Sequence, residues 1–218
     1  MTFHAKSPDL RQNTHALFSG LPHVMDMKDL NQKREIILRH ELAFADEIGS
    51  AVFEKPKVSY WMVFIPILFL YFLYRMQKFK NDRIKFNEEF MTSRRLAMEN
   101  AIDVAEQRGK TETEGVVPGS TLPLPLQKPY ASWIETLSSH YLNLLAANGD
   151  DFESLVRAAY RSRDNYMLTL EMINNAEKDF YTALKPLMAQ IEGTAGIITT
   201  IESQSRRLRH ETACRIFN

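Results

Sequence analysis

Residues 58–76 read VSYWMVFIPILFLYFLYRM, and the organisation of the whole chain depends on this stretch. The 17 residues from Val58 to Tyr74 carry no charge, whereas lysines and arginines stand close by on both sides. The hydrocarbon core of a bilayer is about 30 Å thick, so a helix rising 1.5 Å per residue needs about 17–25 residues to cross it. The stretch therefore predicts a single transmembrane helix over residues 58–76.

Aromatic residues stand near both ends of this stretch, as they do where rings lie in the two headgroup layers of a bilayer. A proline at its centre predicts a kinked membrane helix. The residues expected to anchor the chain in the membrane are Tyr60, Trp61, Pro66, Tyr71, Tyr74 and Arg75. The cations that follow are expected to contact lipid headgroups, namely Lys78, Lys80, Arg83 and Lys85.

Two other interpretations of the stretch remain open. One is a buried core helix of a water-soluble protein. The other is a re-entrant hairpin that turns at Pro66 and keeps both ends on one side of the membrane. Cationic flanks on both sides favour the hairpin slightly, but each arm would have only about 8 residues, and a turn within lipid leaves backbone polar groups without partners.

The distribution of cations predicts the orientation of a single crossing. Residues 38–57 contain three lysines and arginines, and residues 75–94 contain six. This imbalance favours a cytoplasmic C-terminal region. A charged N-terminal arm of 57 residues would then have to cross the membrane, which argues against that orientation.

The composition restricts the class of protein. In the 218 residues, 27 Lys and Arg balance 27 Asp and Glu, so no net basic field is present and nucleic acid is not expected as a partner. The single cysteine, Cys214, excludes an intramolecular disulfide and a thiolate zinc cluster. Only 8 glycines and little alternation of polar with apolar residues favour an all-α fold.

Helix-breaking prolines and glycines, together with the apolar stretch, predict five parts in the chain. They are an amphipathic helical arm (1–57), a transmembrane helix (58–76), a helical stalk (77–109), a Pro/Gly linker (110–127) and a helical bundle (128–218). In the arm, a short helix is expected over residues 7–18 and a longer one from about Asp26 to before Pro56. The longer helix repeats Leu30, Ile37, Phe44 and Ala51 every seven residues, so its apolar face needs a partner. The possible partners are the C-terminal region, a second copy of the chain, another subunit and the membrane surface. The first would require both regions to lie on one side, which conflicts with a single crossing, and another protein chain is favoured over lipid.

The stalk also carries a seven-residue repeat, formed by Ile84, Met91, Met98 and Ala105. A short coiled coil and one face of a local bundle explain this repeat equally well. In the linker, residues 122–125 read LPLP and are expected to be extended. In the bundle, Pro129 is expected to open the first helix. The chain from 151 to 185 is expected to form one helix, or two if it breaks at Asn174–Asn175.

No catalytic motif accompanies these helices. The six histidines show no metal-ligand spacing, and the cations Arg206, Arg207, Arg209, His210 and Arg215 are expected to form a solvated face. We therefore expect no catalytic residue, no metal and no cofactor. The sequence favours a non-catalytic single-pass membrane protein acting as an accessory subunit, scaffold or tether. Its expected partners are membrane lipid and other subunits, or a second copy bound through the amphipathic helices. The alternatives are a membrane-anchored helical sensor or signalling protein and, less favoured, an enzyme with a divergent site in the bundle.

Overall fold

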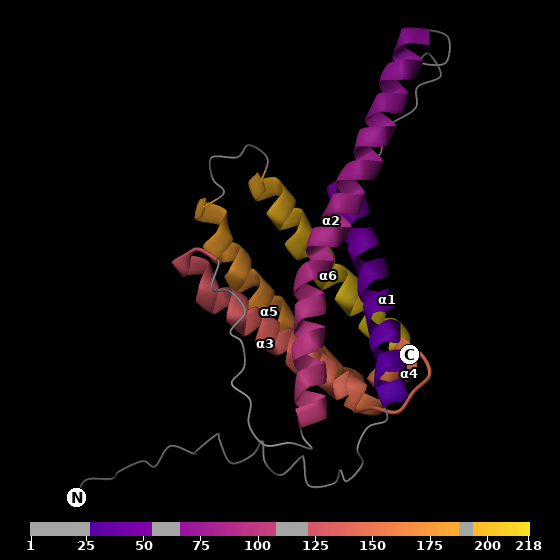
Figure 1. Cartoon of the computed structure of the whole chain (residues 1–218), viewed down its shortest axis with the longest axis vertical. Coiled ribbons are helices and arrows are strands. Elements are labelled where there is room, and N and C mark those ends of the chain that lie inside the picture. The colour runs from indigo at the N-terminus through magenta and orange to yellow at the C-terminus, as the bar shows by residue number, and fades with distance from the viewer. Residues whose placement is uncertain (1–26, 54–65, 108–121, 188–193) are drawn as a thin grey trace, which may run out of the picture.

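A computed structural model describes residues 27–53, 66–107, 122–187 and 194–218, and within these ranges the chain forms helices and no strand. The helices are α1 (Met27–Val52), α2 (Pro66–Gln107), α3 (Leu124–Leu145), α4 (Phe152–Tyr160), α5 (Arg163–Leu187) and α6 (Thr194–Ile216) (Figure 1). The expected all-α class is confirmed. The short helix expected over residues 7–18 lies outside the described residues.

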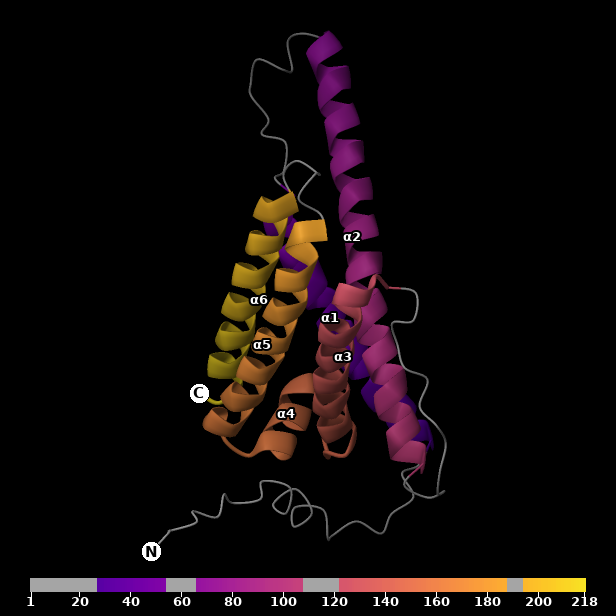
Figure 2. The same cartoon turned by 90° about the vertical axis from the view of Figure 1, so that its left-hand side faces the viewer.

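Five of these helices pack as a closed ring. α1 lies against α2, α2 against α3, α3 against α5, α5 against α6, and α6 returns to α1 (Figure 2). The short helix α4 links α3 to α5 at one end of the ring. The bundle thus contains residues 27–53 and the later part of α2 as well as the C-terminal helices that the sequence predicts.

The apolar face of α1 is covered by the same chain. Leu30, Ile37 and Phe44 of the predicted repeat are buried, as is Ile48, and they pack into cores shared with α2, α3 and α6, whereas Ala51 of the repeat is exposed. The sequence favours another protein chain as the partner of this face, whereas the structure places the chain's own helices there. Sequence periodicity identifies most of the buried face but not what covers it.

The repeat in residues 77–107 lies on a bundle face rather than in a separate coiled coil. Met91 and Met98 are buried in the bundle, whereas Ile84 is exposed. In both views the first part of α2 projects well beyond the other helices (Figures 1 and 2). Pro66 is the first residue of α2, so in the described helix it forms an end and not the kink that the sequence predicts. Among the helices that the structure describes, none is both long enough and apolar enough to cross a membrane.

Two helix boundaries differ from the sequence prediction. Helix α3 begins at Leu124, so residues 124–125 are helical rather than extended, and Pro129 lies inside α3 instead of opening it. Pro125 is tolerated in the first turn because the amide hydrogens there have no helical acceptor, whereas Pro129, one turn further on, removes one helical hydrogen bond. The chain from 151 breaks at Arg161, which takes a left-handed conformation with φ 63°, and not at Asn174–Asn175. Asp151 caps α4, since its carboxylate accepts a bond of 2.7 Å from the Ser154 amide.

Removing a buried side chain of α1 should test its place in the bundle. Ile48 is 0% exposed and packs beside Phe44, Phe90 and Ile201. Ile48→Ala should lower the free energy of unfolding by about 2–5 kcal/mol, since it removes apolar contacts and leaves a cavity. Leu42→Ala changes a residue of the same helix that is 47% exposed, and it should cost less than about 0.5 kcal/mol. Urea denaturation measures both, and equal small losses would show that α1 is not docked.

Candidate functional site

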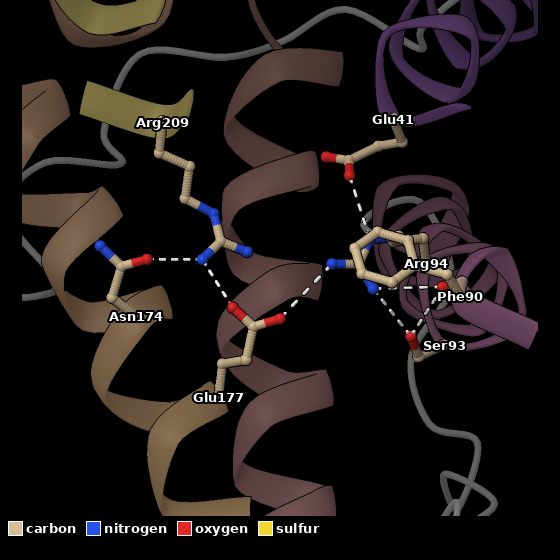
Figure 3. Close-up of polar contacts among 7 residues, drawn as sticks. All are labelled: Glu41, Phe90, Ser93, Arg94, Asn174, Glu177 and Arg209. Atoms are coloured by element: carbon tan, nitrogen blue, oxygen red, sulfur yellow. Dashed lines mark hydrogen bonds and ion pairs between the residues drawn. The ribbon is translucent and has the colours of Figure 1, made fainter. Parts of the chain in front are cut away.

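Four charged side chains alternate in sign across the centre of the bundle. They are Glu41 of α1, Arg94 of α2, Glu177 of α5 and Arg209 of α6, and we call them the buried charge chain (Figure 3). Arg94 is 0% exposed and Glu177 is 2% exposed. Charged residues are rarely buried so completely unless they are paired, so this is the most unusual polar feature of the interior.

Arg94 interacts with residues of α1, α2 and α5. Its Nε donates to Glu41 Oε2 at 3.2 Å, and its Nη2 lies 3.6 Å from Glu177 Oε1. Its Nη1 donates to the Phe90 carbonyl at 3.1 Å and to Ser93 Oγ at 3.2 Å. The guanidinium carbon also lies 3.4 Å from the centroid of the Phe90 ring, where a cation is attracted by the ring's negative face.

Arg209 closes the chain on the other side of Glu177. Its Nη1 donates to Glu177 Oε2 at 2.7 Å and to the Asn174 side-chain oxygen at 2.5 Å (Figure 3). Its guanidinium carbon lies 5.3 Å from the centroid of the Phe44 ring of α1. Arg209 therefore ties α6 to α5 by hydrogen bonds and ion pairing, and contacts α1 as well.

The buried charge chain is neutral in sum, with two guanidinium groups and two carboxylates. Burial alone would raise the pKa of the Glu41 carboxyl, but the neighbouring cations, Arg94 first, lower it below its ordinary value. Burial alone would lower the pKa of Arg209, but Glu177, together with Glu41 and Tyr181, raises it above its ordinary value. Both groups therefore stay ionised near neutral pH, and their charges are compensated by one another instead of by water.

A second polar contact lies nearby between His140 of α3 and Tyr160 of α4. The His140 Nδ1 and the Tyr160 hydroxyl oxygen are 2.5 Å apart, and His140 is buried. Burial lowers the pKa of His140 to about 4 and raises the pKa of Tyr160 to about 12. Near pH 7 the imidazole is thus neutral, and its Nδ1 shares one hydrogen bond with the Tyr160 hydroxyl.

These groups favour a role in packing over a role in chemistry. Glu41, His140 and Arg209 line a small cavity, but each of them is already engaged by another side chain. The described residues include no group of three or more His, Cys, Asp or Glu arranged to hold a metal ion.

The residues expected at the membrane lie away from this interior. Pro66, Tyr71, Tyr74, Arg75, Lys78 and Lys80 belong to the projecting part of α2, whereas Tyr60 and Trp61 lie outside the described residues. Arg83 stands where α2 enters the bundle and pairs with the Asp46 carboxylate of α1. Lys85 is exposed. Their contacts with lipid stay predictions.

Sequence reasoning missed the buried charge chain, although a signal for it exists. Arg94 lies four residues after Phe90 and three before Ala97, which is core spacing on a helix. Glu177 lies four residues from both Ile173 and Tyr181, on the buried face of α5. A charge at a core position of an apolar stripe is that signal. The expected solvated face is wrong for Arg209, whereas Arg206 and Arg207 are exposed.

Comparison of the chain with protein-family models, with curated proteins and with solved structures found no match. The function has to be argued from the arrangement and chemistry of the chain's own residues.

Removing the central cation should destabilise the bundle strongly. Arg94→Met leaves two buried carboxylates without their shared partner, so we expect a loss of about 3–5 kcal/mol in the free energy of unfolding. Arg95→Met alters the exposed neighbouring arginine and should change stability by less than about 0.5 kcal/mol. Chemical denaturation of the two variants makes the comparison. Similar losses for both would mean that the buried charge chain contributes little.

The buried histidine should make the bundle sensitive to acid. The pKa of His140 is about 4 in the folded chain, below its ordinary value of 6.5, so the proton binds more tightly to the unfolded state. Stability is therefore full above pH 6.5 and falls as the pH drops from 6.5 toward 4. This one group contributes a loss of about 3 kcal/mol over that interval. Burial lowers the pKa of His40 too, which adds a loss of the same sign.

His140→Gln keeps a partner for the Tyr160 hydroxyl and removes the titrating group. Its stability should fall less steeply between pH 6.5 and 4 than that of the parent, as measured by urea denaturation at several pH values. His210→Gln, which alters an exposed histidine of α6, should keep the parent's profile. An unchanged slope in His140→Gln would contradict the assignment.

Proposed function

We propose that this chain is a non-catalytic, membrane-attached protein that acts as an accessory subunit, scaffold or tether and holds a helical bundle at a membrane surface. The single observation that carries the proposal is the position of the apolar stretch. Its second half begins α2, and that end of α2 projects beyond the bundle (Figure 2).

The order of residues along the projecting part of α2 supports membrane attachment. Residues 66–74 are uncharged, and Arg75, Lys78 and Lys80 follow on the side nearer the bundle. A helix that enters a bilayer by its tip would place the apolar residues in hydrocarbon and these cations at anionic headgroups. Each cation near such a surface adds on the order of 1 kcal/mol of attraction.

The interior of the bundle supports a role in binding rather than catalysis. Its buried charges neutralise one another, so they stabilise the packing of helices. The outer surface offers apolar contacts, since Leu168 and Met172, one turn apart on α5, are 62% and 57% exposed. Exposed apolar side chains on one helix face are suited to contact with another protein subunit.

The proposal predicts that the protein sediments with membranes and stays there after a high-salt wash. Phe69→Asp combined with Phe72→Asp places two charges in the apolar part of α2, at a cost of about 2.5–3.5 kcal/mol each in hydrocarbon. This variant should move to the aqueous fraction. Val104→Asp alters an exposed residue at the other end of the same helix and should stay with the membrane. A parent protein found in the aqueous fraction would refute the proposal.

A further inference from the structure

We propose that α1 lies on the same side of the membrane as the rest of the bundle, and that the projecting end of α2 enters the bilayer from that side, so that the chain does not cross the membrane between α1 and α2. This inference rests on the proposed membrane attachment and concerns how that attachment is made. It replaces the single crossing that the sequence alone favours, in which residues 1–57 and the C-terminal helices would lie on opposite sides.

The contacts that carry the inference join α1 to α2, the helices on either side of the stretch. Asp46 pairs with Arg83 and also accepts a bond of 3.3 Å from the Asn87 amide nitrogen. The rings of Phe53 and Phe86 lie 5.9 Å apart between centroids, edge to face. Phe53 is the last described residue before the stretch, so the chain enters it from beside Phe86.

The closeness of this approach depends on a glycine. A Cβ atom at Gly49 would lie 3.2 Å from the Phe86 ring, so a larger residue there would push the two helices apart. Together with the Glu41–Arg94 ion pair nearer the centre, these contacts hold α1 antiparallel to α2 over several turns. The two flanks of the apolar stretch are therefore parts of one packed unit.

The reach of the chain excludes a single crossing while this packing is intact. Along α2, Tyr74 is 12 residues from Phe86, or about 18 Å at helical rise. In a single crossing Val58 would lie beyond the far headgroups, about 48 Å from Phe86 once the hydrocarbon core is added. Only five peptide links join Phe53 to Val58, and even fully extended they reach about 18 Å. A single crossing is therefore incompatible with the packing of α1 against α2.

The dimensions of α2 fit insertion into one leaflet. From Tyr74 to Pro66 the helix rises about 12 Å, close to half of the 30 Å hydrocarbon core. The helix also begins with proline, which has no amide hydrogen, so the end that reaches deepest has one unpaired backbone donor fewer. That reduces the cost of placing a helix end in lipid, the main objection to a hairpin.

Charge explains which side the bundle occupies. With both flanks of the stretch on one side of the membrane, the lysines and arginines at positions 55, 57, 75, 78 and 80 all count toward that side. Cations flanking membrane segments concentrate on the cytoplasmic side. The whole bundle is then cytoplasmic, and no charged arm has to cross the bilayer, which removes the difficulty of the single-pass orientation.

Thiol labelling across the membrane tests the inference. Cys214→Ser supplies a background without cysteine, and Glu35→Cys and Arg206→Cys each place one thiol at an exposed position of α1 or α6. Each variant is expressed in bacteria, and both inverted and right-side-out membrane vesicles are treated with a membrane-impermeant maleimide. We expect both positions to react in inverted vesicles and neither in right-side-out vesicles. Detergent-permeabilised samples, where both should react, show that the thiols are available.

The labelling outcomes distinguish one-sided insertion from membrane attachment in general. Reaction of position 35 in one vesicle type and of position 206 in the other would overturn one-sided insertion but leave membrane attachment standing. Reaction of both positions only in right-side-out vesicles would keep one-sided insertion but overturn the cytoplasmic placement. Absence of the parent protein from washed membranes would overturn the proposed function, and one-sided insertion with it.

Discussion

The ion pairs of Arg94 are the constraint on which the rest of the structure depends. This buried guanidinium joins Glu41 of α1 to Glu177 of α5, and Glu177 is in turn held by Arg209 of α6. Buried charges are costly unless geometry keeps them paired, so a shift of any one of these helices along its neighbours would separate opposite charges in a medium with little water. The buried charge chain thereby sets the register of four helices, whereas apolar packing alone tolerates such shifts more easily.

The packing of α1 against α2 brings together the two helices that flank the apolar stretch. If α1 were an independent arm, the stretch could link two compartments. Because α1 is packed into the same bundle as α2, α3 and α6, the helices on both sides of the stretch form one body, and the end of α2 projects from it (Figure 1). In the proposed function this projecting end is the point of attachment to the membrane. Such a body suits a tether that presents a rigid surface at a fixed distance from the membrane.

The bundle contains two hydrophobic cores. One contains Phe44, Ile48, Phe90 and Ile201 and lies where α2 leaves the bundle, so it supports the base of the projecting helix. The other surrounds Trp133, Tyr141 and Tyr166 and packs α3 against α4 and α5. In the second core His140 shares a hydrogen bond with Tyr160, whereas the indole nitrogen of Trp133 has no hydrogen-bond partner among the described residues.

The sequence by itself determined the helical class and most of the buried faces of α1 and α2, such as Ile37 and Met98, because these follow from local periodicity. It also located the uncharged stretch and its flanking cations. The sequence did not predict where α3 begins, since proline is compatible with both a first turn and an extended segment. It also did not predict the break at Arg161. Only the tertiary structure decided that Arg94, Glu177 and Arg209 are buried together and that α1 lies against α2. These contacts join residues far apart in the chain, and a local pattern records that a face is buried but not which helix buries it.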